Sequence, residues 1–242
     1  KHEKWQVTVQ EGKNFEEYAE KKGARIYRSE EIEIRNIPPE APKVVIEPAT
    51  PRFGEKLQAK ITQHATDADG DKVAYRYFWL KNHQLVKFPQ EQDFVEAMEI
   101  RKGEKWSVVV TPFDGEETGK TGEAEVKVIN TAPGAPEIKV EPESPRVTDK
   151  IIVKILKAAP DVDNDTITYR YQWTVNGKPV NFPPDADVLV PGMIAKNHAF
   201  TVTVTPFDGD QDGTPVKAEG RTVNTPPEKP EVAVGPAKPT VL

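Results

Sequence analysis

TDADGDKVAYRYFWL occupies residues 66–80 and has two parts: aspartates at every second position, then a run in which every second residue is apolar or aromatic. A side-chain period of two is that of a β-strand, so residues of equal parity share one face. The set predicted to face a core is Val73, Tyr75, Tyr77 and Trp79. The stretch therefore predicts the central strand of a β-sandwich, entered through an acidic loop.

The pattern returns as PDVDNDTITYRYQWT at residues 160–174. Trp79 and Trp173 lie 94 residues apart, and so do the TPFDG runs that open at Thr111 and Thr205. The proline-rich runs NIPPEAP, NTAPGAP and NTPPEKP start at residues 36, 130 and 224, at the same interval. A unit of this length, with about seven short strands, has the size of an immunoglobulin-like sandwich. The predicted domains are residues 37–130 and 131–224, and the predicted fold class is all-β, with tandem sandwiches in an elongated array.

The ends of the chain look like parts of further repeats. WQVTV at residues 5–9 resembles WSVVV at 106–110, and residues 1–36 are therefore predicted to be the C-terminal strands of a partial preceding repeat. Residues 225–242 are predicted to be a linker and, in PEVAVGP, the first strand of a following partial repeat. Such a chain is most simply a window in a longer array.

One edge of the second repeat differs from the first. The last strand of the first repeat presents Val126 and Val128, where the second has Gly220 and Thr222. We expect this second edge to be less well packed and to offer a route to strand pairing with another chain.

Composition narrows the classes of function. Among 242 residues the formal net charge is −6, which argues against a nucleic-acid surface or an anionic membrane surface. No apolar run reaches the length of a membrane helix, and no signal peptide opens the sequence. Cysteine is absent, so packing or bound ions must hold the cores.

The joint pattern of DxDxD, YxYxW, TPFDG and NTxP at one interval resembles the tandem immunoglobulin-like repeats of bacterial or archaeal surface proteins, which are similar to cadherin-like and polycystic-kidney-disease-like modules. The resemblance implies an extracellular or cell-surface protein without enzymatic activity: a stalk, an adhesion protein or a filament-forming protein, often stiffened by calcium. The implied partners are other repeats of the same protein, further copies in self-assembly, or a cell-surface protein or glycan. Nucleic acid and membrane insertion of this segment are not expected.

The acidic loops are the candidate metal site. In such a sandwich the loop before the central strand and the TPFDG loop lie at the same end, so their carboxylates converge there, and calcium takes six to eight oxygen ligands. The predicted ligands are Asp67, Asp69, Asp71, Asp114, Asp161, Asp163, Asp165 and Asp208.

A plainer interpretation of these loops stays open, because aspartate also caps turns while Gly70 and Asn164 accept positive φ. An EF-hand is excluded, because the twelfth loop position holds Phe78 or Gln172 instead of glutamate.

No pattern of residues indicates catalysis. The four histidines fall at unrelated repeat positions, and duplicated carboxylates in turn-like loops favour scaffolding over a glycosidase pair. An alternative function is an accessory or carbohydrate-binding module of a secreted polysaccharide-active enzyme. It would need solvent-facing aromatics, and the best candidates are Phe78, Phe113 and Phe207.

Overall fold

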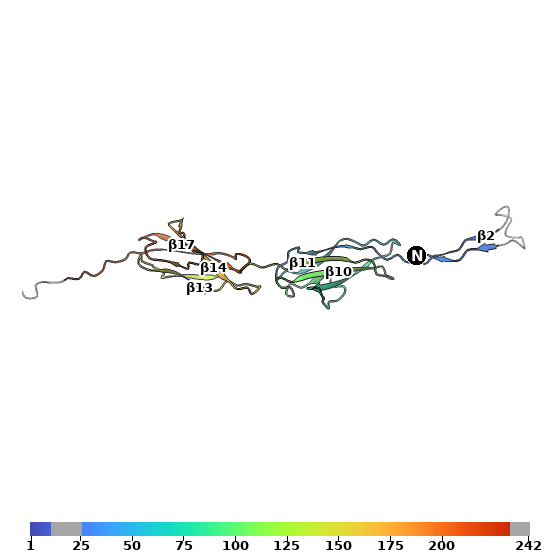
Figure 1. The fold of residues 1–242 in the computed structure, drawn as a ribbon, viewed down its shortest axis with the longest axis horizontal. Coiled ribbons are helices and arrows are strands. Elements are labelled where there is room, and N and C mark those ends of the chain that lie inside the picture. The colour runs from blue at the N-terminus through green and yellow to red at the C-terminus, as the bar shows by residue number, and fades with distance from the viewer. Residues whose placement is uncertain (11–25, 233–242) are drawn as a thin grey trace, which may run out of the picture. The chain divides into compact units, whose positions relative to one another are not determined.

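The computed structural model describes residues 1–10 and 26–232 of the chain (Figure 1). It divides into two compact units, Lys1–Ile129 and Asn130–Leu242. Within the described ranges every regular element is a β-strand, and no helix there has the length and apolar character needed to cross a bilayer. The all-β prediction is confirmed.

The first unit contains a sandwich of two antiparallel sheets, which we call the first sandwich. Their strand orders are β5-β6-β9 and β11-β10-β7-β8. The strands are β5 (Lys43–Glu47), β6 (Leu57–Gln63), β7 (Ala74–Lys81), β8 (Gln84–Leu85), β9 (Phe94–Val95), β10 (Lys105–Phe113) and β11 (Gly122–Lys127).

The core of the first sandwich is built around the predicted central strand, β7. Trp79 is fully buried opposite Val108 of β10, and its indole Nε1 donates a hydrogen bond of 3.0 Å to the Gln92 carbonyl. Tyr75 and Tyr77 pack against the same core. The aromatic face of the strand was thus correctly predicted, because its alternation fixes which side chains point inward.

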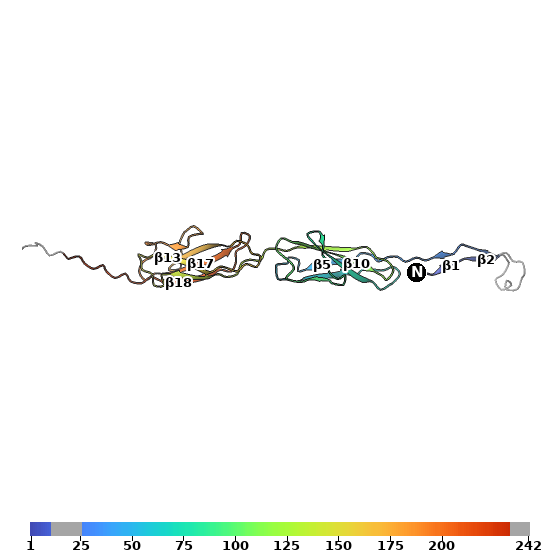
Figure 2. The ribbon, with the colours of Figure 1, turned by 90° about the horizontal axis from the view of Figure 1, so that it is seen from below.

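The second unit repeats this plan in the second sandwich (Figure 2). Its sheets have the orders β12-β13-β16 and β15-β14-β17-β18. The strands are β12 (Glu137–Glu141), β13 (Ile151–Lys157), β14 (Thr168–Val175), β15 (Lys178–Pro179), β16 (Val188–Leu189), β17 (Ala199–Phe207) and β18 (Val216–Arg221). Trp173 is fully buried opposite Val202 and donates to the Ala186 carbonyl at 2.9 Å, as Trp79 does to Gln92.

The last strand of the second sandwich is less buried than its counterpart in the first, as the sequence led us to expect: Val216, Ala218 and Gly220 of β18 are half-buried, whereas Gly122 and Val126 of β11 are buried. The two substituted positions are nevertheless filled or bonded. Gly220 pairs with Phe200, and a Cβ atom on Gly220 would lie 2.5 Å from the Phe200 ring, so the ring fills the space that a larger side chain would need. Thr222 is 1% exposed, and its hydroxyl donates to the Ala195 carbonyl at 2.6 Å. Phe200 and the Thr222 hydroxyl thus compensate in part for the valines that this strand lacks.

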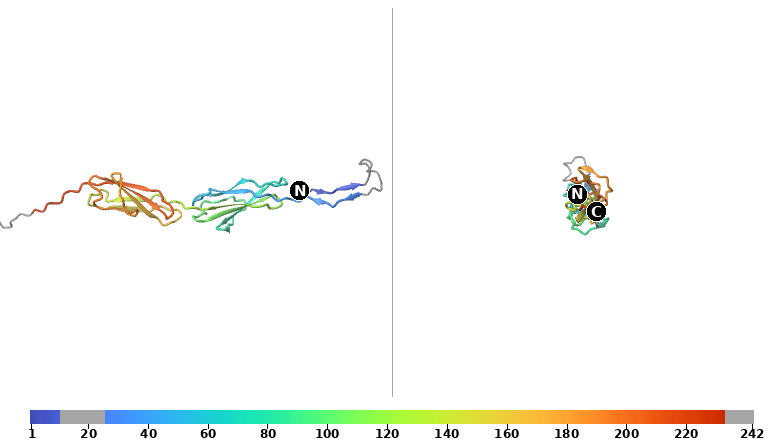
Figure 3. Two further views of the ribbon diagram at one scale, coloured as in Figure 1. Left: turned by 45° about the horizontal axis from the view of Figure 1, so that its top comes forward. Right: turned by 90° about the vertical axis from the view of Figure 1, so that its left-hand side faces the viewer.

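The N-terminal residues form two short antiparallel pairs, which we call the N-terminal ladder. They are β1 (Lys4–Trp5) with β4 (Ile32–Glu33) and β2 (Thr8–Gln10) with β3 (Ile26–Arg28), drawn in blue in Figure 3. Trp5 is 63% exposed and Ile32 68%, whereas Trp106, which matches Trp5 in the sequence repeat, is 1% exposed. That this ladder belongs to a preceding repeat remains a prediction.

At the other end, the predicted strand in PEVAVGP lies only partly within the described residues. No strand is formed there up to Val232, and residues 233–242 lie outside the described range.

Candidate functional site: the acidic loop ends

Each sandwich carries four of the predicted aspartates at one loop end. The first acidic loop end contains Asp67, Asp69, Asp71 and Asp114. The second acidic loop end contains Asp161, Asp163, Asp165 and Asp208.

The first aspartate of each loop shapes the loop itself. Asp67 Oδ1 accepts the backbone N–H groups of Asp69 and Asp71, at 2.9 and 3.1 Å. Asp161 Oδ1 likewise accepts the backbone N–H groups of Asp163 and Asp165, both at 3.0 Å. Gly70 and Asn164 have φ of 80° and 62°, as the turn interpretation predicted.

The TPFDG aspartate binds its own loop and the chain that enters the sandwich. Asp114 Oδ1 accepts the backbone N–H groups of Glu116 and Glu117, both at 2.8 Å, and its Oδ2 accepts a hydrogen bond from Asn36 Nδ2 at 2.9 Å. The hydrogen bond from the Glu117 backbone, followed by those from Asn36 and Glu116, lowers the pKa of Asp114 to about 2. Asp114 is therefore a structural anion that is fixed by donors on both of its oxygens.

The second sandwich has the same arrangement. Asp208 Oδ1 accepts the backbone N–H groups of Asp210 and Gln211, at 2.7 and 2.6 Å, and Oδ2 accepts from Asn130 Nδ2 at 2.7 Å. Asp208 is 7% exposed. The repeated sequence thus produces a repeated set of contacts.

The middle aspartate of each loop also holds the entering chain. Asp69 Oδ2 accepts the Ile37 N–H at 2.8 Å, and Asp163 Oδ2 accepts the Thr131 N–H at 2.7 Å. Two loops therefore clamp the segment just before the first strand of each sandwich, one through the asparagine side chain and one through the next backbone amide.

The carboxylates have part of the geometry of a metal site. Asp67, Asp69 and Asp71 each offer an oxygen within 4.8 Å of the others, and the three equivalent aspartates of the second loop end do the same. Asp114 and Asp208 belong to neither group of three. Asp67 Oδ2, Asp161 Oδ2 and Asp163 Oδ1 are buried without a hydrogen-bond partner, as expected of oxygens available to a cation.

A lysine, which the sequence analysis did not select, lies at the first acidic loop end. Lys1 Nζ is 2.5 Å from Asp71 Oδ2 and 3.0 Å from Glu116 Oε1, and it donates to Asn36 Oδ1 at 3.0 Å. These contacts raise the pKa of Lys1 above its usual value, and the hydrogen bond to Asp71 makes the largest contribution. The available signal was the similarity of KHEKW at residues 1–5 to KGEKW at 102–106.

The aromatic candidates for sugar binding have cations over their rings. The guanidinium of Arg76 lies 4.5 Å from the centre of the Phe113 ring, and that of Arg170 lies 3.8 Å from the centre of the Phe207 ring. A sugar would have to displace these contacts to stack there. The carbohydrate-binding alternative remains a prediction that these two rings do not favour.

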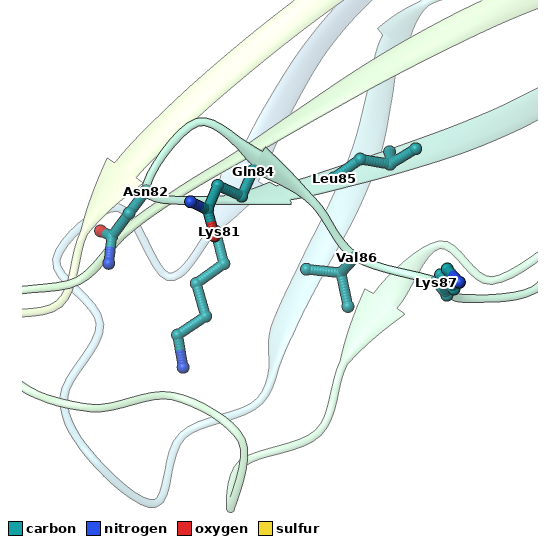
Figure 4. A pocket seen from close by; sticks show the side chains of 6 residues that line it. All are labelled: Lys81, Asn82, Gln84, Leu85, Val86 and Lys87. Atoms are coloured by element: carbon teal, nitrogen blue, oxygen red, sulfur yellow. The ribbon is translucent and has the colours of Figure 1, made fainter.

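A shallow hollow lies beside the hairpin that joins β7 and β8. Figure 4 shows its lining, in which Lys81 and Leu85 extend in different directions from the hairpin. Lys81 is bound to Glu104 at 2.6 Å, and the lining contains no pairing of a nucleophile with a base. The hollow therefore gives no support to a catalytic role.

The comparisons with known proteins concern the fold. No protein-family model matches the chain, and no curated protein matches it. Among solved structures, a two-domain fibronectin type-III segment of chicken tenascin is 13% identical, with a TM-score of 0.41, and the match covers 75% of this chain and 99% of that one. The topology by itself shows two successive β-sandwiches, each of two antiparallel sheets.

Two further solved structures are similar to the chain. The FN1–FN3 domains of chicken CNTN1 are 13% identical, with a TM-score of 0.31 and coverage of 82% of this chain and 73% of that one. The fibronectin(III)-like modules of Clostridium thermocellum CbhA are 18% identical, with a TM-score of 0.29 and coverage of 74% and 94%. The resemblance to cadherin-like or polycystic-kidney-disease-like modules, and a bacterial or archaeal source, remain predictions.

Proposed function

We propose that this chain is a structural segment, without enzymatic activity, of an extracellular or cell-surface protein that acts as a stalk, in adhesion or in a filament. The observation that carries the proposal is the use of the acidic residues. In both sandwiches they bind the backbone and asparagine side chain of the entering segment. Such a clamp resists separation of the entering segment from the sandwich, which is useful in a load-bearing repeat.

Pulling on the two ends of the chain in single-molecule force spectroscopy tests this proposal. Each sandwich should unfold in one event that releases about 30 nm, because an extended chain spans about 3.3–3.6 Å per residue. Asp69→Asn with Asp114→Asn should lower the force of one event and leave the other unchanged. Gradual extension without discrete events would contradict a load-bearing role. Protease treatment of intact source cells should cleave the segment if it is outside the cell.

Calcium binding is a second element of the proposal. The ligands would come from Asp67, Asp69 and Asp71 in the first loop end and from the equivalent aspartates in the second, with the partnerless oxygens as its support. A bound ion would neutralise clustered negative charge and stiffen the loops that hold the entering segment.

Calcium titration followed by calorimetry tests this element. Millimolar Ca²⁺ should raise the melting temperature, and a chelator should reverse the change. Asp161→Asn should abolish the increase in the second sandwich, while Asp185→Asn, an exposed aspartate outside the cluster, should preserve it. Identical melting curves with Ca²⁺ and with chelator would remove calcium from the proposal without affecting the structural role.

A further inference from the structure

The ammonium group of Lys1 is bound by three separate segments of the first unit. Asp71 comes from the loop before β7, Glu116 from the loop between β10 and β11, and Asn36 from the entering segment. An ammonium group has three N–H donors, and here three acceptors surround it. The Lys1 side chain as a whole is 16% exposed, so most of it is covered by the chain.

The sequence repeats both halves of this contact. Lys1 opens KHEKW, and a lysine also stands four residues before the first core aromatic in KGEKW at residues 102–106 and KNHAF at 196–200. The acceptors Asn36, Asp71 and Glu116 return 94 residues later. Their equivalents are Asn130, Asp165 and Asp210.

We propose that the acidic loop end is a receptor for the ammonium group of a lysine that lies four residues before the aromatic residue opening a repeat strand, Trp5 in the case of Lys1, and that Lys1 is this ligand in the first sandwich. The lysine is specified by position, because the strand that follows it fixes where its side chain can reach. Because the acceptor positions recur in the second sandwich, the second acidic loop end is a receptor of the same class and binds an ammonium group.

This inference goes beyond the proposed function and can fail separately from it. A lysine ammonium and a calcium ion carry charge of the same sign, so the two would repel each other at Asp71. The first acidic loop end would therefore bind calcium more weakly than its carboxylates alone would predict.

Hydrogen exchange in the N-terminal ladder tests the proposal. The Ile34 N–H donates to the Glu3 carbonyl at 3.0 Å, close to Lys1 in the chain. Lys1→Met should accelerate exchange of the Ile34 amide by about 10- to 150-fold, the range for one lost charge-assisted hydrogen bond. Lys4→Met is the matched control, because the ion pair of Lys4 with Glu31, at 2.8 Å, is exposed, and its removal should change the rate by less than about 5-fold.

A double-mutant cycle separates a specific contact from general fraying of the ladder. Lys1→Met and Asp71→Asn should be non-additive, because each removes the same interaction, whereas Lys4→Met and Asp71→Asn should be additive. Lys1→Met should also strengthen calcium binding at the first loop end. Equal effects of the two lysine substitutions, or additivity of Lys1→Met with Asp71→Asn, would overturn the proposal.

Discussion

At the scale of single residues, the carboxylate of Asp114 shows how one side chain can join two parts of a sandwich. It accepts two hydrogen bonds from its own loop and one from Asn36 in the entering segment. Its neighbour Asp69 adds the Ile37 amide. These are charge-assisted hydrogen bonds, which are stronger than neutral ones, and their loss should be measurable.

The first prediction concerns the acid stability of the first sandwich. The pKa of Asp114 is about 2 in the folded chain, below the ordinary value of 3.8. Because the folded pKa is the lower one, the stabilisation by Asp114 is complete above about pH 4 and is lost as pH falls towards about 2. Asp114→Asn should lower stability at pH 7 and flatten its decline between those pH values, as measured by urea midpoints. Glu117→Gln, which keeps its backbone N–H, should retain the wild-type pH profile.

The second prediction concerns Gly220. Its Cβ position is occupied by the ring of Phe200, which is 2% exposed. Gly220→Val should therefore destabilise the second sandwich by about 1–3 kcal/mol through overpacking, although Val126 is the native residue at the equivalent place. Phe200→Leu in the same chain should recover part of the loss.

Glu219→Val is the control for Gly220→Val, because Glu219 is exposed on the same strand. It should change the urea midpoint little. A Gly220→Val variant as stable as the wild type would show that the ring can move aside.

The residue scale also marks the limit of sequence reasoning. Burial of Trp79 and Trp173 and positive φ at Gly70 and Asn164 followed from alternation and turn chemistry. The fit of Phe200 over Gly220 did not, because it depends on a pair of residues from different strands. Neither did the contacts of Lys1, whose partners lie 35 to 115 positions further along the chain.

At the scale of elements, the loop between β10 and β11 holds the entering segment by its backbone as well as by Asp114. The Lys120 N–H donates to the Pro39 carbonyl at 3.1 Å, and a Cβ atom on Gly119 would lie 2.0 Å from that carbonyl oxygen. Gly213 stands in the same relation to Pro133, with 2.3 Å to its carbonyl oxygen. Both glycines permit a close approach of two backbones.

The third prediction tests this close approach. Gly119→Ala should separate the loop from the entering segment and lower the stability of the first sandwich by about 1–3 kcal/mol. The exchange rate of the Lys120 amide should rise with it. Thr118→Ala, at the residue before Gly119 in the same loop, is the control, because it adds no atoms to the loop. An unchanged exchange rate of the Lys120 amide would show that the loop and the entering segment shift together and keep their hydrogen bond.

The elements themselves were largely predictable. The two hairpins after the central strands have positive φ at Asn82 and His83 and at Asn176 and Gly177, and Asn-Gly is the pair that such two-residue turns favour. The grouping of three aspartates in each loop was also predicted, but the role of Asp114 and Asp208 as hydrogen-bond acceptors for Asn36 and Asn130 was not. That role depends on which oxygen faces which donor, and residue spacing does not determine it.

At the scale of the whole molecule, the two units have separate cores. One is built around Trp79 and the other around Trp173, and no core residue is shared. Cooperative unfolding follows the core, so each unit should unfold as its own two-state transition.

The fourth prediction tests this independence. Val108 and Val202 are equivalent residues, both fully buried. Val108→Ala should cost about 2 kcal/mol and lower one melting temperature by about 8–16 °C, and Val202→Ala should lower the other. Differential scanning calorimetry can follow both. A shift of both transitions by either substitution would indicate one cooperative unit in place of two.

The unequal exposure of the tryptophans provides an optical probe. Trp79, Trp106 and Trp173 are at most 1% exposed, whereas Trp5, in strand β1 of the N-terminal ladder, is 63% exposed. A collisional quencher in solution should therefore extinguish the emission of Trp5 and spare the other three indoles. The spectrum of the unlabelled protein would report on the ladder separately from the sandwiches.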